Sequence, residues 1–322
     1  MTLTEAIRHV ALARTDDELF GHDPRRQFRR LAAVLHPDRT VTADARQRRA
    51  ATDAFVRLTT RWQARGATTI NGYTVKTPRY VGDIADLYDV GGDRFLKLPR
   101  NRANNDLMAR EQAALRQIEC EGDPRYLPYV PRIVESFRLR DVDTADERRV
   151  TVLAAAPGLV SLAEVRRARP DGLDPRDVAW MWRRLLVALG MAHRAGVVHG
   201  AVVPDHVLIE PAEHGVVLVD WCYSVTYRHD TVPALVPAYV DWYPDEVLER
   251  RQPGPGTDIA MAARCMSALM GRHAPTELRT FIGGCMMPRL DQRPDDAWRL
   301  LRELDLVLER LYGPRTFRPF QL

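Results

Sequence analysis

The chain has 322 residues, of which 45% are hydrophobic and 28% are charged, and its formal net charge is +4. This balance argues against a disordered chain, and the length suggests about two domains. No apolar run approaches the roughly 18 residues of a transmembrane helix, so we expect no membrane partner. The cysteines, Cys120, Cys222, Cys265 and Cys285, lie far apart without C-x-x-C spacing, so they indicate neither a disulfide framework nor a zinc site and favour a reducing, cytoplasmic location.

Charge and lysine usage are both uneven along the chain. Residues 1–66 hold 13 arginines against 8 acidic residues, a net +5, whereas the remainder holds 34 basic against 35 acidic residues, a net −1. The positive charge therefore belongs to the first module, where it favours an anionic partner. Only Lys76 and Lys97 are lysines among the 47 basic residues, so each retained lysine needs a specific explanation.

Three helical patterns occupy residues 1–64. Thr2 and Glu5 predict a capping box at the start of the first helix, and Asp23 with Pro24 predicts the start of the second. The third helix is expected from about Ala43. The apolar stripes of these helices are Leu3, Ile7 and Val10; Phe28, Leu31 and Leu35; and Ala51, Phe55, Leu58 and Trp62. Residues 67–78 are polar and aperiodic, which indicates a linker.

The tripeptide His36-Pro37-Asp38 lies between the second and third helices. With the basic helix before it, this arrangement resembles a J-domain over residues 1–66. The resemblance implies an antiparallel helical hairpin and a partner of the seventy-kilodalton heat-shock chaperone class. It also implies that this chaperone binds a basic surface of the second helix, made of Arg25, Arg26, Arg29 and Arg30.

Other interpretations of the first module stay open. The first helix matches the J-domain family poorly, so a chance tripeptide beside solvated arginines would explain the same residues. A docking module that does not stimulate a chaperone would also fit. Nucleic-acid binding is the least favoured, because no aromatic stacking platform accompanies the arginines.

The second module begins with strands and ends with helices. Residues 79–156 predict strands with one helix over 105–118, and residues 157–312 predict helices interrupted by short apolar strands at 207–209 and 216–219. The last ten residues, 313–322, form a tail. Within this module six short motifs follow one another: Val81-Gly82-Asp83, Phe95-Leu96-Lys97, His199-Gly200-Ala201, Asp220-Trp221-Cys222, Asp245-Glu246 and Gln292-Arg293-Pro294.

The order of these motifs resembles that of the protein kinases over residues 73–312. The resemblance implies an α+β chain, in which the J-domain-like hairpin precedes a bilobal kinase-like fold with a β-rich small lobe and a helical large lobe. It assigns Lys97 to the nucleotide phosphates and Glu111 to its ion-pair partner. A compact ammonium on a flexible stem suits phosphates, which explains why lysine is retained here.

The resemblance also implies the surroundings of an ATP molecule. Gly82 stands in a shortened glycine-rich loop, although a plain hairpin explains it equally well. Ala154 and Ala156 lie on the strand and hinge where an adenine ring would dock, although small residues also serve close packing. Asp220 is the expected Mg²⁺ ligand, whereas His206, in place of the second ligand, offers nitrogen to a cation that prefers oxygen.

The catalytic loop departs from the family in three places. By its register, Ala201 replaces the proton-accepting aspartate, Val203 replaces a lysine and His206 replaces a metal-binding asparagine. Losing the base alone should cost about 10²- to 10⁴-fold in rate. Residues with structural roles in the family remain, namely Glu246 with Arg293 and the loop-bracing Asp258.

Two functions follow from this contrast. The favoured one is a catalytically inactive kinase-like adaptor or scaffold for an unidentified protein client, with a J-domain that recruits a chaperone and with nucleotide binding that leads to no efficient transfer. The alternative is an atypical kinase or nucleotidyltransferase that uses Lys97, Glu111 and Asp220 with a non-standard catalytic group. Asp205 is a weak candidate for that group, because it lies close to the lost position.

Overall fold

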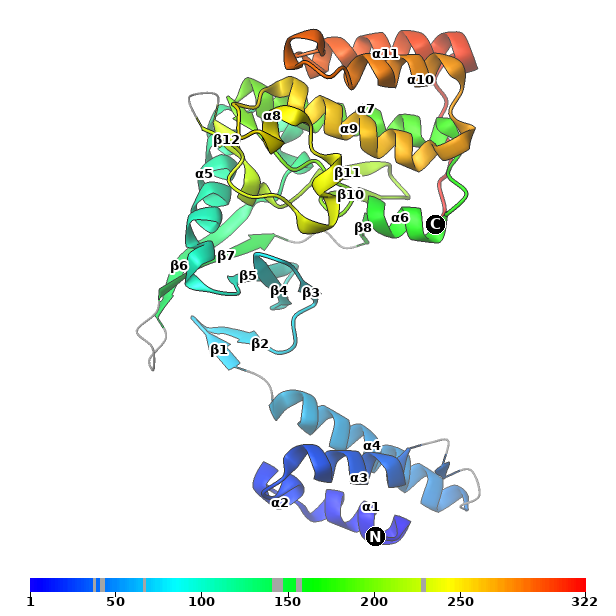
Figure 1. Cartoon of the computed structure of the whole chain (residues 1–322). Coiled ribbons are helices and arrows are strands. Elements are labelled where there is room, and N and C mark those ends of the chain that lie inside the picture. Colours follow the sequence, from blue (N-terminus) through cyan, green and yellow to red (C-terminus); the bar gives the residue numbers. More distant parts are fainter. Residues whose placement is uncertain (37–38, 41–43, 66–67, 141–146, 155–157, 227–229) are drawn as a thin grey trace. The chain divides into compact units, whose positions relative to one another are not determined.

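The structure is a computed structural model that describes residues 1–36, 39–40, 44–65, 68–140, 147–154, 158–226 and 230–322. By their internal contacts these residues form two compact units, Met1–Arg79 and Tyr80–Leu322 (Figure 1). Among the described residues, none of the helices combines the length and the apolar character that crossing a bilayer requires.

The first unit is built mainly from helices: α1 (Leu3–Leu12), α2 (Asp16–Phe20), α3 (Pro24–Leu35) and α4 (Ala45–Arg65). The capping box predicted at Thr2 and Glu5 is present, and Asp23 caps α3 by accepting from the Arg26 amide. Helix α2 was not expected. Its signal was a second capping box, formed by Thr15 and Glu18, in a segment too short to show an apolar stripe.

Helices α1, α3 and α4 pack against one another around one apolar cluster. Its buried members are Ala6, Val10, Ala13, Leu19, Phe20, Leu31, Leu35, Ala51, Ala54 and Leu58. At its edge the rings of Phe28 and Trp62 stack with centroids 4.4 Å apart, which joins α3 to α4. The apolar stripes of the sequence therefore become the core of this unit.

A β-hairpin occupies the segment for which the sequence favoured a linker. Strands β1 (Thr68–Ile70) and β2 (Tyr73–Val75) pair in antiparallel register. The turn between them is Asn71-Gly72, and both residues have positive φ, 47° and 82°. Asn-Gly is the preferred pair for a two-residue hairpin turn, because it tolerates this left-handed backbone. The linker prediction was wrong because it relied on the lack of apolar periodicity and ignored this dipeptide.

The second unit begins with a five-stranded antiparallel sheet in the order β3-β4-β5-β7-β6. Its strands are β3 (Tyr80–Val81), β4 (Ala85–Asp89), β5 (Arg94–Pro99), β6 (Ile133–Arg140) and β7 (Glu147–Ala154). Helix α5 (Asn105–Glu121) packs against this sheet and buries Met108, Glu111 and Leu115. Lys97 lies on the central strand, paired with Leu87 on one side and Thr151 on the other.

The rest of the second unit is mainly helical. Its helices are α6 (Leu162–Ala168), α7 (Pro175–Arg194), α8 (Asp245–Leu248), α9 (Pro255–Met270), α10 (Thr276–Cys285) and α11 (Ala297–Tyr312). Short strands form two small sheets: β8 (Val160–Ser161) with β10 (Val207–Glu210) and β11 (Gly215–Leu218), and β9 (Val197–Val198) with β12 (Val225–Thr226). Short 3-10 segments include Trp221–Tyr223 and Pro237–Trp242.

Helices α7 and α9 lie together at the centre of this helical part, and α11 packs on α7. The strands β10 and β11 pair in antiparallel register, Val207 with Leu218, so they bring the segment before β10 beside the segment after β11 (Figure 1). Each segment carries polar residues in an otherwise apolar core. This juxtaposition builds the candidate site.

Candidate functional site

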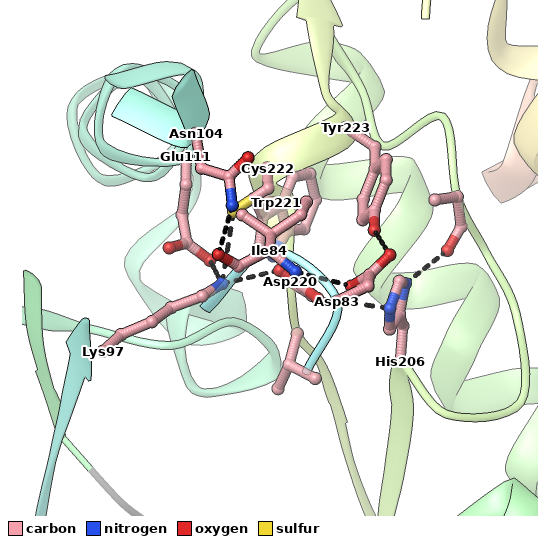
Figure 2. A network of polar contacts seen from close by, with 12 residues as sticks. Asp83, Ile84, Lys97, Asn104, Glu111, His206, Asp220, Trp221, Cys222 and Tyr223 are labelled. Carbon is pink, nitrogen blue, oxygen red and sulfur yellow. Dashed lines mark hydrogen bonds and ion pairs between the residues drawn. The ribbon is translucent and has the colours of Figure 1, made fainter. Parts of the chain in front are cut away.

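A buried ammonium is the centre of the polar cluster in Figure 2. Lys97 Nζ lies 2.8 Å from Glu111 Oε1, which joins strand β5 to helix α5. The Lys97 and Glu111 side chains are 4% and 0% exposed, so bulk water screens neither charge. Burial raises the pKa of Glu111, although the charge of Lys97 opposes that rise.

Asp220 contributes a second carboxylate to Lys97. It follows β11 in a left-handed conformation, φ 66°, and its Oδ1 lies 2.6 Å from Lys97 Nζ. Although burial by itself would lower the pKa of Lys97, the charge of Asp220 and its neighbours raises that pKa well above its usual value. Burial opposes ionisation of Asp220 as well, but Lys97 and His206 hold its pKa well below the usual range.

Cys222 completes the surroundings of the ammonium. Its Sγ lies 3.2 Å from Lys97 Nζ, and its side chain is fully buried. Burial, with the nearby charge of Glu111, raises the pKa of this thiol well above its usual value. Cys222 is therefore a protonated thiol, which makes it a weak metal ligand and a weak nucleophile.

His206 binds the other oxygen of Asp220. Its Nε2 lies 3.3 Å from Asp220 Oδ2, and its Nδ1 lies 2.9 Å from the Ala201 carbonyl oxygen. Both ring nitrogens thus face acceptors, which only a ring with two N–H groups satisfies. Burial alone would lower the pKa of His206, but the charge of Asp220 raises it above its usual value.

The loop before His206 carries no carboxylate at its centre. Ala201 and Val203 are both fully buried and belong to the apolar core. Asp205 is exposed, and its carboxylate accepts a hydrogen bond from Tyr239, whose pKa is raised by burial and then by this bond. The structure brings together Lys97, Glu111, Asp220 and His206 and gives Asp205 a different partner.

Asp258 braces this loop from α9. Its Oδ1 accepts from the Gly200 amide at 2.9 Å, and its Oδ2 accepts from the His199 amide at 2.7 Å. His193 Nε2 lies 2.9 Å from the same Oδ2. Gly200 has φ 75°, and a Cβ on it would lie 2.7 Å from the Tyr223 carbonyl oxygen, so a larger residue would disturb the loop.

Gly82 and Asp83 form the turn between β3 and β4. The Gly82 amide donates to the Ala85 carbonyl at 3.2 Å, and a Cβ on Gly82 would lie 2.6 Å from that oxygen. A tight turn therefore accounts for this glycine. Asp83 Oδ2 accepts from the Tyr223 hydroxyl at 2.8 Å, so the turn is tied to the segment after Asp220 (Figure 2).

A second buried ion pair lies in the helical part of this unit. Arg293 donates to Glu246 Oε1 at 2.7 Å and to Oε2 at 3.2 Å, and Thr257 Oγ1 donates to Oε1 at 2.8 Å. This bidentate geometry satisfies both charges where bulk water is excluded. Neither residue belongs to the polar cluster around Lys97.

The remaining predicted residues lie outside this cluster or outside the described residues. Ala154 ends β7 and pairs with Arg94, whereas Ala156 is not among the described residues. Pro37 and Asp38 are not described either. His36 caps the end of α3 and packs edge-on against Phe55. The basic residues of α3 all have exposed side chains: Arg25, Arg26, Arg29 and Arg30.

Sequence reasoning missed three residues of the site. Cys222 was considered only as one of four cysteines without paired spacing and as the end of a motif, although it contacts Lys97. Tyr223 and His193 were not considered, because their hydrogen-bond partners lie far away in the sequence. Tyr223 directly follows the Asp220-Trp221-Cys222 motif, and this position is the signal that could have identified it.

An antiparallel five-stranded sheet with one helix, followed by a helical lobe and joined by a buried Lys–Glu–Asp cluster, defines a protein-kinase-like fold. The structure resembles that of vaccinia related kinase 3, with a TM-score of 0.58 and 16% sequence identity. The similarity covers 76% of this chain and 90% of that chain. No protein-family model matches the sequence. At this identity the comparison establishes the fold, so the predicted kinase-like architecture is confirmed.

Proposed function

We propose that this chain is a kinase-like adaptor or scaffold that does not transfer phosphate efficiently. The observation that carries the proposal is the position of Ala201, where a proton-accepting carboxylate is needed and a buried methyl group stands. A missing base costs about 10²- to 10⁴-fold. Val203 and His206, in place of a lysine and a metal-binding asparagine, add further losses.

Several contacts support a scaffold. The contacts of Lys97 with Glu111, of Asp258 with the loop amides and of Arg293 with Glu246 are each buried. These contacts join β5 to α5, the loop to α9, and α8 to the segment before α11, and they need no transferred group. Lys97 remains the residue that would contact the phosphates of ATP.

The alternative, an atypical transferase, depends on a substitute catalytic group. Lys97, Glu111 and Asp220 are retained for it. Asp205, the candidate base, is exposed and bound to Tyr239, which argues against a role beside Asp220. This contact makes the scaffold the better supported function.

A transfer assay tests the proposal. Purified protein is incubated with Mg²⁺, γ-labelled ATP and peptide substrates, and label in protein and peptide is compared with that of Asp220→Ala. We expect equal background in both proteins. Label in the wild type well above the Asp220→Ala background would overturn the proposal, because it would require a working catalytic group.

The first unit is proposed to recruit a chaperone of the seventy-kilodalton class to a protein client bound by the kinase-like unit. The exposed arginines of α3 support an acidic partner, and His36 stands at the end of that helix. Chaperone ATPase stimulation tests this, with His36→Gln and Arg29→Glu as variants. Both should lose stimulation, whereas Arg8→Glu, an exposed arginine on α1, should keep it. Wild-type protein without stimulation would refute chaperone recruitment.

A further inference from the structure

The donor atoms around Asp220 are a poor match for the Mg²⁺ that a kinase-like fold implies. Mg²⁺ takes six oxygen ligands in near-octahedral geometry and is not satisfied by nitrogen or sulfur. Within the described residues, Asp220, Glu111 and Cys222 place their ligand atoms within 4.8 Å of one another. Two of the three supply oxygen, and the third supplies a thiol. His206, at the position of the second family ligand, supplies ring nitrogen.

Both oxygens of Asp220 and one oxygen of Glu111 already face nitrogen donors. Asp220 Oδ1 is held by Lys97 at 2.6 Å, and Asp220 Oδ2 faces His206 Nε2 at 3.3 Å. Glu111 Oε1 is held by Lys97 at 2.8 Å, whereas its Oε2 is buried without a hydrogen-bond donor among the described residues. A cation at either oxygen of Asp220 would have to displace the N–H donor of Lys97 or His206, and displacement of Lys97 would cost its buried ammonium one of its two carboxylate partners.

The surroundings of His206 restrict the water that a metal would bring. The Tyr223 ring stacks on the His206 ring with centroids 5.5 Å apart, and Tyr223 itself is fully buried. The Tyr223 hydroxyl is fixed by Asp83 from the β3–β4 turn (Figure 2). Protein-bound Mg²⁺ usually keeps several waters, and this stack fills the His206 side of the cluster.

We infer that Lys97 and His206 replace the divalent cation in this cluster, so that Asp220 is a structural acceptor between two nitrogen donors and binds no Mg²⁺. The inference concerns the same site as the proposed function and rests on the register assigned there. Asp220 then connects three elements: strand β5 through Lys97, the loop before β10 through His206, and its own segment after β11.

Manganese binding tests the inference. Mn²⁺ replaces Mg²⁺ at oxygen sites, and its free concentration is measured by electron paramagnetic resonance. We expect the full-length wild type to bind no Mn²⁺ at Asp220, so that wild type and Asp220→Asn give the same binding curve. Uptake of one equivalent by the wild type that Asp220→Asn abolishes would overturn the inference.

A gain-of-function variant tests the part assigned to His206. His206→Asn removes a nitrogen donor and supplies an amide oxygen, so we expect it to bind one Mn²⁺ that the added Asp220→Asn change removes. A folded His206→Asn protein that binds no Mn²⁺ would overturn the role of His206. If this variant does not fold, the wild-type comparison still decides the inference.

The outcome is separable from that of the proposed function. Mn²⁺ bound at Asp220 without phosphate transfer contradicts the inference and leaves the scaffold proposal standing. Phosphate transfer without metal at Asp220 contradicts the scaffold proposal and leaves the inference standing.

Discussion

Arg293 and Glu246, 47 residues apart in the sequence, form a bidentate ion pair in which each side chain is only 2% exposed. The pair links α8 to the segment before α11. The pair contributes to the stability of the fold only while both partners are present, because a buried charge without its partner is strongly destabilising.

Removal of one partner from this pair should therefore destabilise the kinase-like unit. We expect Arg293→Ala to lower the free energy of unfolding by about 3–5 kcal/mol, since Glu246 would keep a buried charge. Urea denaturation followed by tryptophan fluorescence measures the change. Arg289→Ala is the control, because its ion pair with Asp291 is exposed and its loss should leave the curve unchanged. Equal curves for both variants would contradict this assignment.

The two lysines of the chain offer a matched comparison. Lys97 is buried between Glu111 and Asp220, whereas Lys76 is exposed. Lys97→Met should destabilise the protein by about 3–5 kcal/mol, because two carboxylates lose their common cation. Lys76→Met should have no effect. Thermal unfolding of both variants without added nucleotide measures the difference. An unaltered melting temperature for Lys97→Met would show that the contacts of Lys97 do not stabilise the fold.

Two glycines should respond in opposite directions to alanine. A Cβ on Gly190 of α7 would lie 2.6 Å from Trp298 Nε1, whereas a Cβ on Gly283 of α10 would meet nothing within 4 Å. We expect Gly190→Ala to destabilise the protein by about 1–3 kcal/mol through overpacking. Gly283→Ala should stabilise it by about 0.5–1 kcal/mol, because alanine favours the helix. Chemical denaturation checks both signs, and stabilisation by Gly190→Ala would refute the described α7–α11 contact.

Stability should fall at mildly acidic pH because of His199. This ring is buried and neutral, since its Nε2 donates to the Val219 carbonyl at 2.9 Å and its Nδ1 accepts from the Ala201 amide at 3.2 Å. Burial lowers the pKa of His199 from 6.5 to about 4. Between these values the unfolded chain binds a proton that the folded chain does not bind. The free energy of unfolding should therefore decrease as the pH falls through this window, by roughly 3 kcal/mol in total.

The slope of stability against pH in His199→Gln measures this contribution. The variant should lose the His199 part of the slope between pH 6.5 and 4, whereas His22→Gln, at an exposed position, should keep it. His206 acts in another window, because its pKa is raised and its stabilisation is lost above pH 6.5. An unchanged slope in His199→Gln below pH 6.5 would refute the neutral buried ring.

Much of the local structure was predictable from the sequence. Thr2 with Glu5 and Asp23 with Pro24 mark the starts of α1 and α3, and the helix expected over 105–118 is α5 (Asn105–Glu121). Capping and apolar periodicity act between residues a few positions apart, so sequence alone records them. The Asn71-Gly72 turn is an equally local signal, and it accounts for the hairpin in the segment predicted as a linker.

The central residues of the site were predictable from the sequence, but most of their contacts were not. Motif order placed Lys97, Glu111, His206 and Asp220 in one neighbourhood, and the absence of a carboxylate at Ala201 was visible in the sequence. Only the tertiary structure decided that both oxygens of Asp220 face nitrogen donors and that Asp83 binds Tyr223 across 140 residues. Such contacts depend on how strands and loops distant in sequence meet in three dimensions, and no propensity of neighbouring residues encodes that geometry.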